Sequence, residues 1–423
     1  MAIIKPFKGI RYNPELVDIK SVVTPPYDII SKDDQERFYS KDEHNIVRII
    51  LGKELDDNET SNKYTRAKGF LTDWLSKKVL ISEDRPSIYI YEQEFTIEKE
   101  QKNRMGFISL LKLEDFSSGV VVPHEYTYSK PITDRFNLLS TTQANFGLIF
   151  LLHSDPKGLI DAELHKETEK EPLHDFVFEN GIKNRLWRMD DEEKIEHLQD
   201  EMKDKILFIA DGHHRYETAL TYKNKMGGKG EQPYDYRMMA LFNMDNPNLE
   251  IFPTHRIVSN LKVDKQEIIE KIEKLFSVES FRGNQKEFFR LLKEKGDKEH
   301  SFGLYFGKGE FYFLTLKDEK FALEQSDQTK SADWRKLDVS ILHKLILEKL
   351  LGIEKVEDHI KYTRSNDEAV EKIDKGEAQL TFLLNTTKLE ELKKVTSHKE
   401  RMPQKSTYFY PKLLTGLVVY KFL

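Results

Sequence analysis

The segment ILFIADGHHRYETALTYKNK at residues 206–225 constrains the fold more than any other part of the chain. ILFIA is short, apolar and partly β-branched, which is typical of a buried strand, whereas YETALTYKNK favours a helix. Asp211-Gly212, between the two, is a turn signal. The sequence therefore predicts a strand that passes directly into a helix, with the residues after Gly212 at the helix N-terminus.

Helical and extended patterns alternate along the rest of the chain. We expect helices over 61–78 and 264–276, an antiparallel pair of strands over 87–98 and 102–116, and hairpins over 174–191 and 301–316. This mixed order indicates an α+β fold with mixed sheets. We predict three regions: an N-terminal α+β region at 1–115, a second region at 116–230 and a C-terminal α+β region at 231–423.

The composition excludes several classes of protein. The chain has 73 acidic and 67 basic residues in mixed runs and a formal charge of −6, so no basic face for duplex nucleic acid is expected. It has no cysteine, which excludes disulfides, thiol nucleophiles and cysteine-ligated metals. No apolar stretch of membrane-spanning length and no signal-peptide pattern occurs, so we expect a cytoplasmic protein without a membrane partner.

The residue types in DGHHR point to an anion site. The first N–H groups of a helix lack partners within the helix, and its dipole is positive at this end. Gly212 allows a ligand to approach the backbone, Arg215 offers a bidentate clamp, and His213 or His214 can donate further hydrogen bonds. Adjacent histidines on a helix point about 100° apart, so a metal site is not expected. The alternative is that Asp211 merely caps the helix and that the histidines are exposed or hydrogen-bonded to nearby carbonyls.

Several motifs together resemble a known family. ADGHHRYETAL, PFKGIR, PPYDII, VPHEYTYSKPITDRFNLL, PTHRIV and MPQKSTYFYPKLLTGLV resemble a bacterial family catalogued as a domain of unknown function. PHE followed by DGHHR resembles the two signature boxes of the free-serine kinases, which belong to the ParB/sulfiredoxin superfamily. The resemblance implies a ParB/sulfiredoxin-like core with additional α/β elements, and a phosphate-binding region at 116–230.

The same resemblance implies roles for individual residues. Glu125 corresponds to the base of the free-serine kinases, and His124 is placed to orient it or to bind phosphate. The phosphate box consists of Asp211, Gly212, His213, His214 and Arg215. This chain departs from the simpler kinases because a long charged segment, 126–210, separates its two boxes. Phosphate binding depends on the box itself, whereas substrate choice depends on the residues around it, which this segment can reshape.

Two further clusters are candidate substrate or phosphate contacts. His255 and Arg256 begin an apolar stretch, where a second anion contact and a buried hydrogen-bonded pair are equally good readings. The proline-punctuated segment near the C-terminus offers Lys405, Ser406, Thr407 and Lys412. These side chains suit a phosphate or a carboxylate, but the alternating aromatic residues equally suit an ordinary edge strand.

The sequence thus predicts an enzyme that transfers phosphate to a small hydroxylated amino acid, with free L-serine as the acceptor and O-phosphoserine as the product. The expected donor is ATP, ADP or pyrophosphate, with Mg²⁺ bridging its phosphates. Two alternatives stay open, a phosphatase acting on phosphoserine or a similar ester and a nucleotide-binding module without turnover. The GGKG segment lacks the spacing of a phosphate-binding loop, and no dinucleotide-binding motif occurs.

Overall fold

A computed structural model describes residues 1–353 and 355–422. The chain divides into two compact units. The first consists of Met1–Pro123, Thr127–Glu250 and Pro411–Leu423, and the second of His124–Tyr126 and Ile251–Tyr410. The first unit thus collects segments from the beginning, middle and end of the chain. The three regions predicted from the sequence, with boundaries at 115 and 230, remain a prediction.

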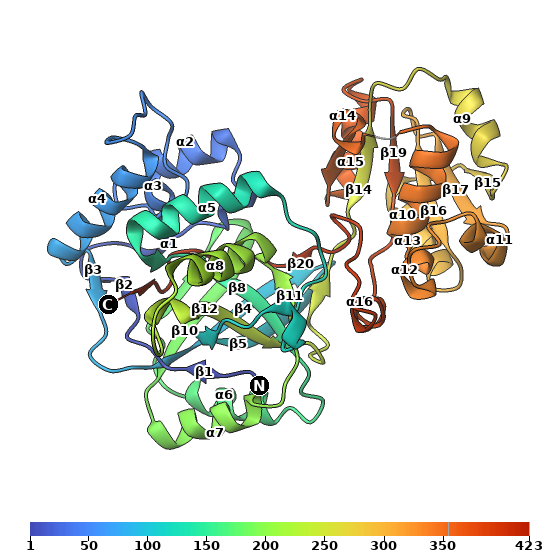
Figure 1. Ribbon diagram of the computed structural model, residues 1–423. Coiled ribbons are helices and arrows are strands. Elements are labelled where there is room, and N and C mark those ends of the chain that lie inside the picture. The colour runs from blue at the N-terminus through green and yellow to red at the C-terminus, as the bar shows by residue number, and fades with distance from the viewer. Residues whose placement is uncertain (354, 423) are drawn as a thin grey trace. The chain divides into compact units, whose positions relative to one another are not determined.

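Within the described residues, the first unit is built on a mixed nine-stranded sheet (Figure 1). The strand order is β6-β11-β8-β12-β5-β4-β10-β9, and β1 pairs with β5. The bounds are β1 (Ile4–Lys5), β4 (Ile88–Ile97), β5 (Glu100–Lys112), β6 (Val121–Val122), β8 (Ile149–His153), β9 (His174–Val177), β10 (Lys183–Met189), β11 (Leu207–Asp211) and β12 (Tyr236–Asn243). Two small sheets pair β2 (Ile10–Tyr12) with β3 (Leu80–Ser82) and β7 (Ala144–Asn145) with β21 (Tyr420–Lys421).

The pairing follows from the sequence patterns. β4 and β5 form the predicted antiparallel pair, and β9 and β10 form the predicted hairpin across the turn at 179–181. Every residue of β8 and β12 is buried, which suits two neighbouring central strands covered on both faces. β12 runs parallel to β8, and β11 runs parallel to β6, whereas the remaining pairs in the sheet are antiparallel.

Helices cover this sheet. They are α1 (Ile19–Val22), α2 (Lys32–Lys41), α3 (Val47–Ile50), α4 (Lys63–Ser76), α5 (Ser129–Thr142), α6 (Leu159–Glu167), α7 (Glu192–Met202) and α8 (His213–Met226), with short 3₁₀ turns at Tyr27–Ile29, Phe116–Ser118, Glu179–Gly181 and Pro233–Asp235. α5 and α8 lie side by side (Figure 1). Asn62 caps α4, which lies within the helix predicted over 61–78, and Leu71 and Trp74 are buried on it. α4 packs against α5 and so extends the helical layer.

The second unit contains a six-stranded antiparallel sheet with the order β15-β17-β16-β19-β14-β18. Its strands are β14 (His255–Val258), β15 (Phe276–Phe281), β16 (Ser301–Tyr305), β17 (Phe311–Leu316), β18 (Ile360–Thr363) and β19 (Leu380–Leu383). Its helices are α9 (Lys265–Ile272), α10 (Gln285–Gly296), α11 (Glu319–Glu324), α12 (Ala332–Lys336), α13 (Asp338–Ile341), α14 (Val356–His359), α15 (Asn366–Asp374) and α16 (Leu389–Ser397), with a π-helix at Leu342–Leu350. The short strands β13 (Glu250–Ile251) and β20 (Phe409–Tyr410) complete the set.

The predicted α+β class with mixed sheets is confirmed. The predicted hairpin over 301–316 is β16 and β17. The helix expected over 264–276 is shorter, because α9 ends at Ile272 and the chain enters β15 at Phe276. Phe276 is fully buried, and its burial in the strand outweighs the weak local preference for a longer helix.

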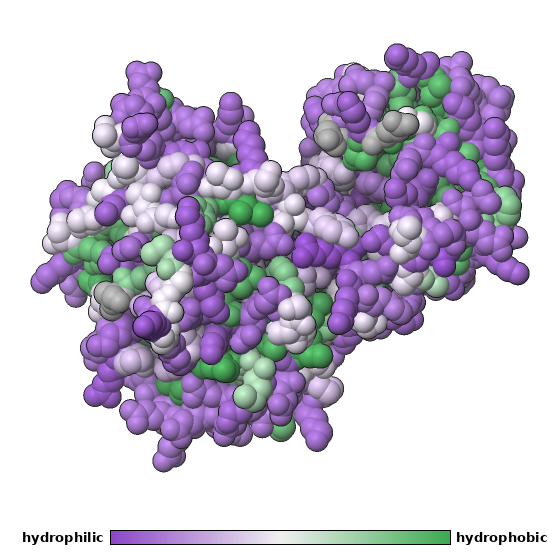
Figure 2. Space-filling model, viewed as in Figure 1, coloured by the Kyte–Doolittle hydropathy of each residue, from purple (hydrophilic) through white to green (hydrophobic). Residues whose placement is uncertain are grey.

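Hydrophilic residues cover most of the face drawn in Figure 2, with smaller apolar areas between them. This agrees with the high share of charged residues in the sequence, 33%. Among the helices of residues 1–353 and 355–422, none is long and apolar enough to cross a membrane.

Candidate functional site

The turn from β11 to α8 has the geometry that the sequence predicts. β11 ends at Asp211, Gly212 is the N-cap residue, and α8 begins at His213. Gly212 has φ +97°, a left-handed conformation that glycine adopts without strain. A Cβ at this position would lie 3.0 Å from Nε of Arg215, so glycine also leaves space for that guanidinium. The N-cap residue is Gly212, which has no side chain, and the carboxylate of Asp211 contacts Arg215 and Lys412.

Asp211 organises two cations behind this turn. One carboxylate oxygen accepts a hydrogen bond from Nη2 of Arg215, and the other lies 2.5 Å from Nζ of Lys412. The side chains of Arg215 and Lys412 are 8% and 9% exposed. Burial alone would raise the pKa of Asp211, but Lys412 and Arg215 outweigh it and lower this pKa. Asp211 is therefore a carboxylate at neutral pH and is unsuited to act as a base.

The two histidines of the box differ in their surroundings. His213 is 6% exposed. His214 is half-buried, and its Nε2 accepts a hydrogen bond from the backbone N–H of Tyr128 at 3.0 Å. The rings of His214 and Tyr128 are stacked with 6.2 Å between their centroids. The start of α5 therefore holds the imidazole of His214 beside the first turn of α8.

Arg215 faces away from solvent into a pocket of the first unit. Its Nη1 donates to the carbonyl oxygen of Leu148. The pocket is lined by Tyr27, Ile50, Arg135, Leu138, Leu139, Ala144, Phe146, Gly147, Arg215, Thr218, Arg237 and Thr415. Two further arginines, Arg135 and Arg237, thus line the same pocket as the arginine of the box, and neither was predicted from the sequence as a ligand contact.

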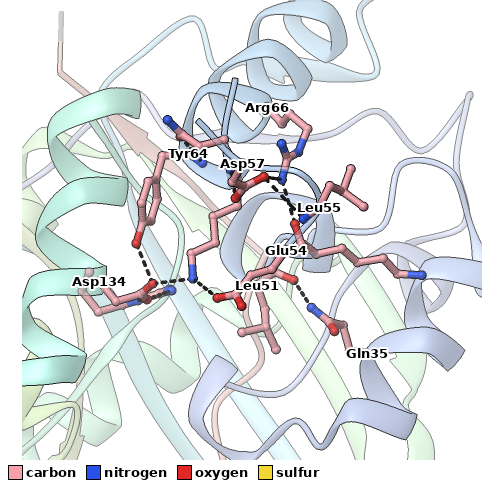
Figure 3. Close-up of polar contacts among 12 residues, drawn as sticks. Gln35, Leu51, Glu54, Leu55, Asp57, Tyr64, Arg66 and Asp134 are labelled. Carbon is pink, nitrogen blue, oxygen red and sulfur yellow. Dashed lines mark hydrogen bonds and ion pairs between the residues drawn. The ribbon is translucent and has the colours of Figure 1, made fainter. Parts of the chain in front are cut away.

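One wall of this pocket is braced by the network in Figure 3. Tyr64 points at Asp134 and donates a hydrogen bond of 2.9 Å to its carboxylate, and Nζ of Lys63 lies 3.0 Å from the same group. The next residue along α5, Arg135, donates to the carbonyl oxygen of Ile50 at 2.7 Å. α4 and the end of α3 thereby fix the part of α5 that carries Arg135.

Glu125 and His124 belong to the second unit. His124 is 1% exposed, and its Nε2 lies 2.7 Å from Oγ1 of Thr407 and 4.0 Å from a carboxylate oxygen of Glu125. Burial lowers the pKa of Arg256 to about 10, although the nearby charge of Glu125 acts in the opposite direction. Three sequence motifs, PHE, PTHRIV and QKST, therefore meet in one polar cluster of the second unit.

Other candidates in the second unit have structural partners. His255 is fully buried, with Nε2 2.8 Å from Oδ1 of Asn366 and Nδ1 accepting from the N–H of Leu384. Burial lowers its pKa to about 4. Arg256 is also fully buried and donates to His343 and to the carbonyl oxygens of Thr254 and Lys405. This arrangement corresponds to the hydrogen-bonded reading of the HR pair.

The C-terminal candidates go to different places. Ser406 is buried, and its Oγ donates to the carbonyl oxygen of Pro403, so it stabilises a local turn. Lys405 is exposed and supplies its carbonyl oxygen to Arg256. Thr407 contacts His124 in the second unit, whereas Lys412 contacts Asp211 in the first. In residues 1–353 and 355–422, no group of three or more His, Asp or Glu side chains is arranged to hold a metal.

Comparison with solved structures finds similar chains at low identity. A free serine kinase variant in complex with AMP is 16% identical, with 70% of this chain and 89% of that chain covered and a TM-score of 0.36. A conserved hypothetical protein from Pyrococcus furiosus is 14% identical, with 69% and 87% covered and a TM-score of 0.34. SbnI from Staphylococcus aureus, truncated at its C-terminus, is 9% identical, with 73% and 85% covered and a TM-score of 0.35.

No curated protein matches the chain. A family model described as a protein of unknown function (DUF1015) matches residues 4–340, which is more than half of the sequence. Membership of a domain-of-unknown-function family, as the motifs predict, is thereby confirmed, and the chain belongs to the DUF1015 family.

Proposed function

We propose that this protein is a small-molecule kinase that transfers a phosphoryl group to free L-serine and forms O-phosphoserine. The observation that carries the proposal is the turn from β11 to α8. It combines a helix N-terminus without a side-chain cap, a glycine at φ +97° and buried cations gathered around Asp211. The ParB/sulfiredoxin-like character of the first unit's core is part of the same proposal.

Electrostatics favour an anion at this turn. A helix such as the 14-residue α8 carries about half a positive charge at its N-terminus. Arg215 and Lys412 bring two positive charges, which Asp211 balances only in part. The donor's phosphate oxygens would accept hydrogen bonds from the backbone N–H groups of the first turn and from the side chain of His213 or His214. The two ion pairs of Asp211 fix the side chains of Arg215 and Lys412 beside the turn.

Glu125 is the base in this proposal. Its carboxylate would accept the proton of the serine hydroxyl, and the serine oxygen would form a bond to the donor's terminal phosphorus. The bond from that phosphorus to the bridging oxygen breaks, and the shortened donor leaves with the electron pair. The side chain of Glu125 is 21% exposed, so it retains access to a substrate. The similarity of PHE and DGHHR to the signature boxes of the free-serine kinases supports this role.

Mg²⁺ is part of the proposed reaction as a partner of the donor. Because the described residues contain no cage of metal ligands, the ion would arrive bound to the donor phosphates. It would neutralise charge on the transferred group. The protein's own contribution is to bind the phosphates, orient the acceptor and take the hydroxyl proton.

The proposal is tested by incubating the full chain with Mg²⁺, L-serine and either ATP, ADP or pyrophosphate. O-phosphoserine is measured by mass spectrometry, and phosphate release from added O-phosphoserine is measured in parallel. Formation of O-phosphoserine with one donor supports the kinase. Release of phosphate without any formation of O-phosphoserine would instead assign the site to a phosphatase. If neither activity is detected, the protein would be assigned to the non-catalytic binding modules.

A further inference from the structure

The pocket beside Arg215 contains a buried guanidinium that lacks an acidic partner. Arg237, in β12, is 7% exposed and donates from Nη2 to the carbonyl oxygen of Gly147 at 3.0 Å. Its Nε is buried and has no hydrogen-bond acceptor, and within the described part of the chain no carboxylate forms an ion pair with it. A buried cation in this state is costly unless an anion joins it.

The two neighbouring arginines each contact a carboxylate, in contrast to Arg237. Arg215 pairs with Asp211, and Arg135 pairs with Asp134. The guanidinium of Arg135 also lies 4.0 Å from the centroid of the Tyr27 ring. Burial, followed by the nearby charge of Arg215, lowers the pKa of Arg237 to about 9, so the side chain remains charged at neutral pH. Of the three arginines that line the pocket, Arg237 is therefore the one without a carboxylate partner among the described residues.

The remaining lining indicates the class of anion. Leu138, Leu139 and Phe146 form apolar walls, and Ala144 and Ile50 add to them. A phosphate group requires polar partners on several sides, whereas a carboxylate on a short carbon chain presents one charged end and one apolar end. Burial raises the pKa of Tyr27 to about 12, so its hydroxyl stays protonated and can donate to a carboxylate.

We infer that this pocket binds the carboxylate of a small organic acid, with Arg237 as the guanidinium that anchors it and the apolar walls in contact with its carbon chain. Two parallel N–H groups of a guanidinium match the two oxygens of a carboxylate. Gly147, whose carbonyl oxygen accepts from Arg237, also lines the pocket. A Cβ there would make ordinary van der Waals contacts, 3.4 Å from Nη1 of Arg215 and 3.7 Å from Oγ1 of Thr415, and would therefore occupy part of the pocket without a clash. The inference concerns binding alone and holds whether or not the protein transfers phosphate.

Calorimetric titration of the full chain tests this inference. The probes are propionate, L-serine and inorganic phosphate, with propionamide as the uncharged isostere of propionate. Propionate or L-serine should bind at one site, and propionamide should not. Arg237→Met should weaken the binding about tenfold or more, since it removes a charge-assisted hydrogen bond. The matched control is Arg37→Met, whose side chain is 48% exposed and forms surface ion pairs.

Two further measurements separate a ligand anchor from a structural residue. The thermal midpoint of ligand-free Arg237→Met should equal or exceed that of the wild type, because the variant loses an uncompensated buried charge. Gly147→Ala keeps every charge but narrows the pocket, so it should weaken carboxylate binding even if Arg237→Met fails to fold. Equal binding of propionate and propionamide, unchanged affinity in both pocket variants, or binding of phosphate alone would each overturn the inference.

Discussion

Replacing Asp211 with asparagine removes the carboxylate on which Arg215 and Lys412 converge. Both cations are more than nine-tenths buried, and the side chain of Asp211 is 16% exposed. Breaking a buried ion pair from one side leaves an uncompensated charge and typically costs about 3–5 kcal/mol. We expect Asp211→Asn to destabilise the first unit by about this amount, and Asp211→Asn with Lys412→Met to recover part of it because one unpaired charge is gone.

Hydrogen exchange measured by mass spectrometry can locate this effect. Since about 1.4 kcal/mol corresponds to a tenfold change, peptides from β11 and α8 should exchange roughly two to four orders of magnitude faster in Asp211→Asn. Peptides from β16 and β17, in the second unit, serve as internal reference. The matched control is Asp73→Asn, which removes an exposed ion pair with Lys77 and should change stability by less than about 1 kcal/mol. Equal exchange in the two variants would refute the reasoning.

The same cluster predicts how stability depends on acid. The pKa of Asp211 is lower in the folded protein than its ordinary value of 3.8. Its stabilising contribution is therefore fully present above about pH 5 and is lost as the pH falls below that ordinary value toward the lower pKa of the folded state. In Asp211→Asn this part of the acid sensitivity should be absent.

Two other substitutions test the fold around the site. Gly212→Ala should lower the free energy of unfolding by about 1–2 kcal/mol because of the left-handed backbone, and it should weaken phosphate binding measured by calorimetry. The control is Gly69→Ala, in open space on α4, which should stabilise the protein slightly. Burial, with a contribution from Arg11, lowers the pKa of His174 from 6.5 to about 4. The folded protein therefore holds this histidine neutral, and the stability that depends on the neutral form is fully present above pH 6.5 and declines as the pH falls toward 4. At pH 5 the loss is about 2 kcal/mol, and His174→Gln should reduce the drop in thermal midpoint between pH 7 and pH 5; an unchanged drop would contradict this.

Local structure could be predicted from the sequence because it depends on neighbouring residues. The strand, turn and helix around Gly212 follow from apolar pattern and turn chemistry, and the pairing of β4 with β5 follows from their alternation and short connection. α10 was not predicted, although Asn284 as N-cap and the spacing of Phe288 and Leu292 signal it. The helical and extended patterns of the sequence thus predict most of the helices and strands.

Long-range contacts could not be predicted in the same way. Lys412 reaches Asp211 across 201 residues, and the sequence suggested only that this lysine contacts an anion. Arg237 is a lone charge at the start of the apolar run YRMMALFN, which is a detectable signal, but its lack of an acidic partner depends on strands that are distant in sequence. Burial and pairing are decided by tertiary packing, so the pocket became visible only in the structure.

The most direct test of the proposed reaction compares the wild type with Glu125→Gln. Donor binding is measured by calorimetry, and O-phosphoserine formation from the donor and L-serine is measured in a single turnover. We expect Glu125→Gln to bind the donor as the wild type does but to lose most of its turnover, because a neutral amide cannot take the hydroxyl proton. Glu171→Gln, on an exposed segment, is the control and should retain activity. Turnover in Glu125→Gln equal to that of the wild type, or no O-phosphoserine from the wild type with any donor, would contradict the account.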